Sequence, residues 1–200
     1  MRAHRCDDAG QAFPIYITVV AGLLFLAFAY LAVGQAAANR NGAQTAADAA
    51  ALAAAQETRH QLAGQWLDDV LDPTKWQDIF DGKLPDDVAC VRARQLAEQN
   101  DAALDGEGCV RPEPLTYTVT VKTNKSVGES IVPGTENRYS RASATAVIDP
   151  LCTFPPLTEG AGDATLPQLT CKDGRTWDLD PHDPTRLPGP EDLFDVHLAD

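Results

Sequence analysis

The stretch from Phe13 to Val33 reads FPIYITVVAGLLFLAFAYLAV and decides how the rest of the chain is interpreted. No charged side chain occurs anywhere between Ala9 and Asn39. A helix of this length extends about 30 Å, which is the thickness of the hydrocarbon core of a bilayer. Pro14 stands in the first turn, where its missing N–H costs a helix nothing. The sequence therefore predicts a transmembrane helix over residues 13–34.

The charges that flank this stretch predict its orientation. Arg2 and Arg5 precede the apolar stretch, whereas only Arg40 follows it closely. By the positive-inside rule, residues 1–12 are cytoplasmic and the C-terminal domain lies outside the cytoplasm. A cleaved secretory signal is the alternative, because residues 36–38 fit a small-x-small cleavage site. The N-terminal residue of the mature chain distinguishes the two interpretations.

The segment 35–63 that follows contains thirteen alanines. Alanine is the strongest helix former, so we expect the transmembrane helix to continue through this segment. Small side chains also permit close approach between helix backbones. The positions expected to pack against partner helices are Gly34, Ala47, Ala51 and Ala54. A stiff monomeric stalk is the alternative that composition leaves open.

The string QTAADAAALAAA from Gln44 to Ala55 carries a family resemblance. Together with the short N-terminus ending at Gly10 and the apolar stretch, it is similar to the start of TadE/TadG-like proteins, pseudopilin-like components of the Tad machinery that assembles Flp pili. The residues that match the family motif are Gln44, Ala47, Asp48 and Leu52. The resemblance implies a membrane-anchored, non-catalytic component that contacts other pilus or secretion-apparatus subunits through its N-terminal helix.

One position departs from the pilin pattern. Type IV pilins carry a glutamate five residues after the glycine of the cleavage point, and counting from Gly10 that position is Ile15. The resemblance therefore implies a permanently anchored component more than a cleaved subunit of the pilus shaft.

Four cysteines follow the apolar stretch, and they form two pairs with equal spacing. Cys90 and Cys109 are separated by nineteen positions, as are Cys152 and Cys171. In an oxidising compartment such a set predicts two disulfides, and the simplest of three possible connectivities joins each pair. The spacing excludes an ordinary zinc site because no C-x-x-C pair exists.

Two segments alternate between apolar and polar residues, as half-buried strands do. Leu115 to Thr123 places Leu115, Tyr117, Val119 and Val121 on one face, and Tyr139 to Asp149 alternates in the same way. They predict an antiparallel hairpin, with a further strand at residues 130–132.

Helical patterns precede this hairpin. Asp86 and Asp87 are candidate caps of a helix that runs through about Ala103 and ends at Gly106 and Gly108. Trp76, Ile79 and Phe80 predict a short helical piece, and together with Trp66 we expect them in the core.

The expected fold class is α+β: a single transmembrane helix, extended as an alanine-rich helix, packs on a small antiparallel sheet with two disulfides. The α+β domain is expected over residues 64–150. Residues 151–200 are rich in proline and acidic side chains, which predicts a disulfide loop followed by an irregular tail.

Charge and motifs exclude several functions. The chain has 29 acidic and 16 basic residues, so we expect its surface to repel nucleic acid and anionic lipid headgroups. The segment from Asp178 to Asp183 begins like a calcium loop, yet Asp183 and Gly189 replace the glycine and glutamate that such a loop needs. No G-x-S-x-G or phosphate-binding loop occurs. We therefore predict no catalytic residue, no cofactor or metal and no small-molecule substrate.

Two functions from different classes remain. The first is a non-catalytic component of a Tad/Flp-type pilus assembly or secretion apparatus. The second is a membrane-tethered extracytoplasmic binding module unrelated to pili, in which the helix is only an anchor. A cell-envelope hydrolase would need a catalytic constellation that the sequence lacks.

Overall fold

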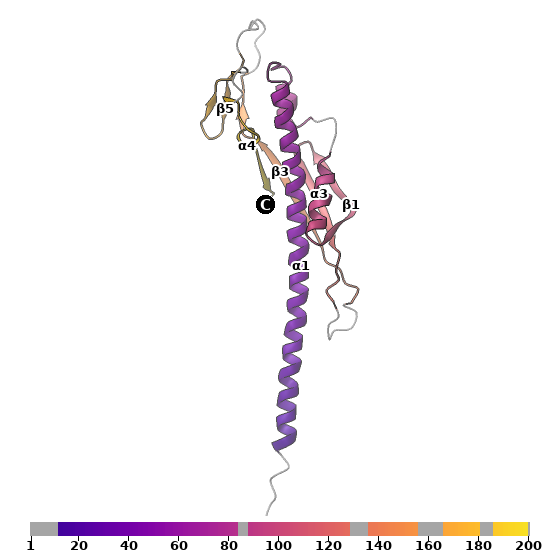
Figure 1. Ribbon diagram of the computed structural model, residues 1–200. Coiled ribbons are helices and arrows are strands. Elements are labelled where there is room, and N and C mark those ends of the chain that lie inside the picture. Colours follow the sequence, from indigo (N-terminus) through magenta and orange to yellow (C-terminus); the bar gives the residue numbers. More distant parts are fainter. Residues whose placement is uncertain (1–11, 84–87, 129–135, 156–165, 181–185, 200) are drawn as a thin grey trace, which may run out of the picture.

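One long helix organises the molecule. The computed structural model describes residues 12–83, 88–128, 136–155, 166–180 and 186–199. Helix α1 (Ala12–Asp68) is 57 residues long, and its first half projects away from every other element (Figure 1). It continues without a break through residues 36–38 and through Gly42. The expected helical extension over residues 35–63 is therefore confirmed.

A four-stranded antiparallel sheet packs against the second half of α1. Its strands are β1 (Ala102–Glu113), β2 (Thr116–Thr123), β3 (Arg141–Pro150) and β7 (Phe194–Leu198), in that order across the sheet. In the β2–β3 pair, Tyr117 lies opposite Ala146 and Val119 lies opposite Ala144. Both strands bury the face that the alternating pattern indicated, so the predicted hairpin is confirmed.

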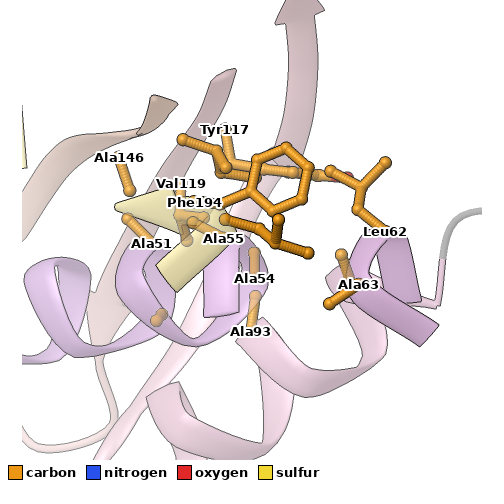
Figure 2. Packing of buried hydrophobic residues seen from close by; sticks show 14 of the residues in the cluster. Ala51, Ala54, Ala55, Leu62, Ala63, Ala93, Tyr117, Val119, Ala146 and Phe194 are labelled. Atoms are coloured by element: carbon orange, nitrogen blue, oxygen red, sulfur yellow. The ribbon is translucent and has the colours of Figure 1, made fainter. Parts of the chain in front are cut away.

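Helix α3 (Ala89–Gln99) packs on α1 through alanines. Ala89, Ala93 and Ala97 are each 0% exposed and recur every four residues, so they share one face of α3. Figure 2 shows Ala93 facing Ala54 of α1, and Ala54 is also 0% exposed. Because neither side chain extends beyond Cβ, the two helices can pack at the short end of the usual interaxial range of about 8–10 Å.

Helix α3 is shorter than the sequence predicts. The chain leaves it at Asn100, passes through Asp101 with a φ of 55°, and enters β1 at Ala102. Ala102 pairs with Thr123 of β2, so strand pairing prevails over the helix preference of alanine. The expected end of the helix at Ala103 is therefore wrong.

The glycines expected to end that helix lie inside β1 instead. Gly106 and Gly108 both have a φ of 65° and fall between Leu104 and Cys109, where the register with β2 shifts. A left-handed backbone suits glycine, and an irregularity of this kind re-aims the strand. The expected caps at residues 86–87 and the strand expected at residues 130–132 lie outside the described residues.

Aromatic side chains close the core at the end of α1. Helix α2 (Trp76–Phe80) lies there as predicted, and the ring centroids of Trp66 and Trp76 are 5.6 Å apart. Phe154 packs edge-on against Trp76 at 5.4 Å and against Phe80 at 5.7 Å. Trp66 and Trp76 are both 0% exposed, so the predicted core aromatics are confirmed.

The C-terminal region is more regular than its composition predicts. A second sheet consists of β4 (Cys152–Thr153), β5 (Leu169–Cys171) and β6 (Thr176–Trp177), and α4 (Pro190–Leu193) leads directly into β7. Phe194 of β7 is 0% exposed, and the strand pairs with β3 at the edge of the larger sheet. The expected irregular tail is therefore wrong over residues 194–198, which form a strand. The expected α+β fold class is confirmed.

Both predicted disulfides are present. Cys90 of α3 bonds Cys109 of β1, with 5.7 Å between the Cα atoms. Cys152 and Cys171 lie opposite each other in β4 and β5, with a Cα separation of 3.9 Å. In the chain-entropy model, closing a loop of about twenty residues stabilises the folded state by roughly 3 kcal/mol.

Candidate functional site

Helix α1 changes its surroundings halfway along its length. In its first half the large apolar side chains are exposed, for example Phe25 at 65% and Leu31 at 56%. The helix is long and apolar enough to cross a membrane, and none of its most apolar window is buried. A core helix of a soluble protein would be mostly buried, whereas a signal sequence near an N-terminus meets the same criteria. We call residues 13–42 the exposed half and residues 43–68 the domain half.

Polar groups of the exposed half are suited to lipid. The Thr18 hydroxyl donates a hydrogen bond of 2.5 Å to the carbonyl of Pro14, so its polarity is satisfied inside the helix. Tyr16 and Tyr30 are 71% and 83% exposed and stand near the two ends of the apolar stretch. Aromatic rings with one polar atom favour these depths, where hydrocarbon meets headgroups.

Asn39 joins the helix to the sheet at the lower edge of the domain. Its side-chain amide donates to the carbonyls of Lys125 and Ser126 at 3.2 and 3.3 Å. The hydroxyl of Thr123, the last residue of β2, donates to the side-chain amide oxygen Oδ1 of Asn39 at 3.4 Å. Asn39 is six residues beyond Val33, which corresponds to about 9 Å along the helix axis. The domain therefore begins almost directly above the apolar stretch.

The residues of the family motif lie in the domain half. Ala47, Ala51 and Ala54 are each 0% exposed within the chain's own core. The Gln44 side chain donates a hydrogen bond of 2.7 Å to the Asp48 carboxylate on the surface, and Leu52 is half-buried against the core. The motif therefore seats α1 in its own domain through small side chains on one face.

Gly34 lies in different surroundings from these three alanines. A Cβ atom placed on Gly34 would meet nothing within 4 Å, and the same holds for Gly42. Ala38, midway between them, is exposed as well. Residues four apart share one side of a helix, so these three form a smooth row, which we call the small-residue row. Ala38 and Gly42 were not among the packing positions predicted from the sequence, although their spacing of four residues from Gly34 could have indicated them.

A buried hydrogen bond fastens the domain half of α1 to the middle of the sheet. The Thr58 hydroxyl donates to the Tyr117 hydroxyl at 2.8 Å, and the two residues are 1% and 0% exposed. A buried hydroxyl without a partner is costly, so this pair favours one rotation of the helix on the sheet.

Asp178 of the candidate cation loop and His197 each form hydrogen bonds with groups of the protein. Asp178 accepts a hydrogen bond of 2.5 Å from the Gln168 amide, and residues 181–183 of the loop lie outside the described residues. No group of three or more metal-ligating side chains occurs in the part of the chain that the structure describes. A hydrogen bond to the Leu198 carbonyl and the nearby Asp149 carboxylate raise the pKa of exposed His197.

Comparison with known proteins assigns the N-terminal part of the chain. Residues 10–57 match the model of a family described as "Putative Flp pilus-assembly TadE/G-like". The matched segment covers the exposed half of α1 and the first turns of its domain half. No curated protein and no solved structure matched the chain. The match confirms the resemblance that the residues from Gly10 to Ala55 carry.

The match also narrows the function. A family of pilus-assembly components supports a pilus-associated role, and together with the exposed apolar helix it points to a membrane-anchored protein. Residues 10–57 are similar to the TadE/G-like Flp pilus-assembly family, and the same helix carries an α+β domain with two disulfides.

Proposed function

We propose that this protein is a non-catalytic, membrane-anchored component of a Tad/Flp-type pilus assembly or secretion apparatus. Residues 13–34 cross the membrane with the N-terminus in the cytoplasm and the domain outside it. The observation that carries this proposal is a single unbroken helix: the stretch from Phe13 to Val33 exposes its large apolar side chains, and the domain half packs in the domain core.

The continuous helix couples the membrane to the domain mechanically. Hydrogen bonds at Asn39 and Thr58 hold the sheet to α1 at two heights, and α3 packs beside it. No described residue between 12 and 68 leaves the helix, so the structure offers no hinge between span and domain. A displacement or tilt of the span is therefore passed to the domain. This property suits a component that transmits position within an assembly more than it suits a flexible tether.

The small-residue row is the proposed contact with partner helices. Gly34 lies at the outer end of the apolar stretch, and Ala38 and Gly42 lie beside the lower edge of the domain, where their exposed side of α1 lets another helix approach closely. Helices in membranes associate by close packing at small residues of this spacing. Ala47, Ala51 and Ala54 are occupied by the chain's own domain, which leaves the row as the better candidate.

Substituting the row tests the proposed contact. Gly34→Leu combined with Gly42→Leu adds bulk where nothing lies within 4 Å, and leucine favours helix more than glycine does. The fold should therefore tolerate the change, whereas co-purification with the other Tad components from the native membrane should fall. Ala36→Leu is the matched control, because residue 36 is also exposed and points roughly away from residue 34. Equal co-purification of both variants would rule out this contact.

Cys6 provides a test of the orientation. Four of the five cysteines are in disulfides, so Cys6 is the thiol left for labelling. A membrane-impermeant maleimide should label it only after the cells are opened. Labelling in intact cells would show that the orientation is the reverse of the proposed one. A mature chain that begins at Asn39 would show that the apolar stretch is a cleaved signal and not an anchor.

Exchanging the span distinguishes the assembly role from a simple tether. Replacing residues 13–34 with an unrelated apolar span of equal length keeps the domain anchored and removes both the specific apolar surface and Gly34, the first residue of the small-residue row. We expect pilus assembly to be lost although the protein remains in the membrane fraction. Full assembly with the exchanged span would favour the binding-module alternative.

A further inference from the structure

Positive charge gathers at the end of the domain that lies nearest the apolar stretch. Arg40 is on α1, Lys122 and Lys125 lie at the end of β2, and Arg138 precedes β3. Arg40, Lys125 and Arg138 are exposed, and Lys122 is partly exposed. We call these four residues the basic collar.

Hydrogen bonds place the collar residues at one height on α1. Asn39, the neighbour of Arg40, donates to the carbonyl of Lys125. The amide of Val127 donates a bond of 2.8 Å to the Arg138 carbonyl, which brings Arg138 to the same level. The ammonium of Lys122 lies 4.5 Å from the centroid of the Tyr139 ring, so this cation lies over the residue that follows Arg138 in the chain.

The collar lies just above the layer of lipid headgroups, within electrostatic reach of it. Arg40 is seven residues beyond Val33, which is about 10 Å along the helix axis. The headgroup layers widen a bilayer from about 30 Å to about 40–45 Å, or about 5–8 Å on each side. The Debye length is about 8 Å at physiological salt, so the collar lies within reach of the phosphate charges.

The charges of the collar are only weakly compensated within the chain. Lys125 lies 3.3 Å from Asp101, but their side chains are 77% and 76% exposed, and such pairs contribute little. Arg40 and Arg138 have no ion-pair partner among the described residues, and Glu136 is the nearest described acid in sequence to Arg138.

The acidic residues of the helix end are concentrated at the opposite pole. Four aspartates lie just beyond the end of α1: Asp69, Asp72, Asp78 and Asp81. Among the described residues, Lys75 and Lys83 are the cations that pair with them. The formal net charge of −13 is therefore an average over a molecule whose charge is polarised along α1. The end near the membrane is basic, and the far end is acidic.

We infer that the basic collar docks on anionic phospholipid headgroups of the bilayer that α1 spans. This inference rests on the proposed membrane anchoring. Tyr139 adds an exposed aromatic ring of the kind found at membrane interfaces. Docking at the β2–β3 connection and at Arg40 restrains a tilt of the helix away from that side, because such a tilt lifts Lys125 and Arg138 from the headgroups.

The full-length chain in vesicles tests the inference. Tyr139→Trp places a fluorescent reporter at the collar, whereas the native tryptophans lie in the domain above it. The vesicles consist of phosphatidylcholine with a headgroup nitroxide quencher, with or without a third of the lipid replaced by phosphatidylglycerol. Each cation near an anionic surface strengthens attachment about fivefold, so quenching should be at least about twofold greater on anionic vesicles and should disappear in molar salt.

Two charge variants in the same background provide the contrast. R40Q/K125Q/R138Q should reduce quenching on anionic vesicles to the level seen with phosphatidylcholine alone. K75Q/K83Q/R92Q removes the same charge farther up the domain and should leave the difference between the vesicles unchanged. The salt titration of the unsubstituted reporter chain gives an independent readout if a variant fails to fold.

Each outcome has a definite meaning. Equal quenching on both vesicle types, or quenching that survives the collar substitutions, overturns docking. Loss of co-purification with other subunits in the collar variant, without any dependence on lipid charge, assigns the collar to a protein partner and also overturns lipid docking. A chain that fails to float with the vesicles overturns the anchoring itself, whereas a chain that floats without responding to lipid charge overturns only the docking.

Discussion

The exposed half and the domain half of α1 belong to one helix, yet they depend on different surroundings. In the domain half, alanines such as Ala51 are 0% exposed because the sheet and α3 cover them. In the exposed half, Phe25 and Leu31 are more than half exposed because no other element of the chain reaches them. Large apolar residues thus line the exposed half, whereas every buried side chain between residues 43 and 55 is an alanine. Close packing against the sheet and α3 requires small side chains there, and nothing in the chain limits side-chain size in the exposed half.

The largest expected effect comes from truncating an aromatic residue in each half. Trp66→Ala removes a side chain that is 0% exposed and stacks near Trp76, so the free energy of unfolding of the domain should fall by about 3–5 kcal/mol. Phe25→Ala should change the same quantity by less than about 0.5 kcal/mol. Denaturant unfolding in detergent micelles measures both. A large domain destabilisation by Phe25→Ala would show that the two halves are not independent.

Added bulk is expected to give the next effect. Ala51→Leu forces three more carbons into the contact of α1 with the domain and should destabilise the domain by about 1–3 kcal/mol. Ala36→Leu makes the same change on an exposed surface and should leave the unfolding midpoint unchanged. Thermal melts followed by circular dichroism compare the two. If Ala51→Leu melts like the parent chain, the close packing described for the domain half is incorrect.

Loss of a hydroxyl that contacts the domain half, compared with loss of one in the exposed half, sharpens the comparison further. Tyr117→Phe removes the acceptor of the buried Thr58 hydroxyl and should cost about 1–2 kcal/mol of unfolding free energy. Tyr16→Phe deletes the same atom where the ring is 71% exposed and should have no measurable effect on domain unfolding. Adding Thr58→Val to Tyr117→Phe should recover part of the loss, because the stranded hydroxyl is then gone. No recovery would mean that the hydrogen bond is not the cause.

The smallest effect is a pH dependence confined to the domain. A hydrogen bond to the Leu198 carbonyl, followed by one to Asp149, raises the pKa of His197 above its ordinary value of 6.5. The protonated form is therefore favoured by folding, and its contribution is present below the unfolded pKa and disappears as the pH rises through the folded pKa. Asp149→Asn should lower the pKa of His197 in an NMR titration. An unchanged titration would show that the Asp149 carboxylate does not raise the pKa of His197.

Strands with regular alternation could be predicted from the sequence, whereas irregular ones could not. β2 and β3 alternate over eight and ten residues, and their register follows the predicted faces. β1 carries Gly106 and Gly108 within an irregular pairing, which hides its period. β7 does alternate, through Phe194, Val196 and Leu198, but its proline-rich and acidic surroundings favour an irregular tail. Edge pairing with β3 supplies the hydrogen bonds that its composition does not suggest.

The candidate site was predicted only in part for a similar reason. Gly34 was predicted as a packing position because small residues permit close approach of helices. The sequence does not distinguish Ala47, Ala51 and Ala54 from Ala36 or Ala38, however. Alanine packs equally well against a partner helix, its own sheet or lipid. Only the folded domain shows which of these surfaces it already covers.

The sequence by itself determined the apolar span, the alanine-rich extension, two alternating strands and two equally spaced cysteine pairs. These features are local or strictly periodic, so neighbouring residues contain the whole signal. The tertiary structure alone decided where α3 ends, that residues 194–198 join the sheet, which alanines are covered, and that cations gather beside Asn39. Each of these depends on residues far apart in the chain meeting at one place, and long-range pairing can outweigh the local preference of any segment.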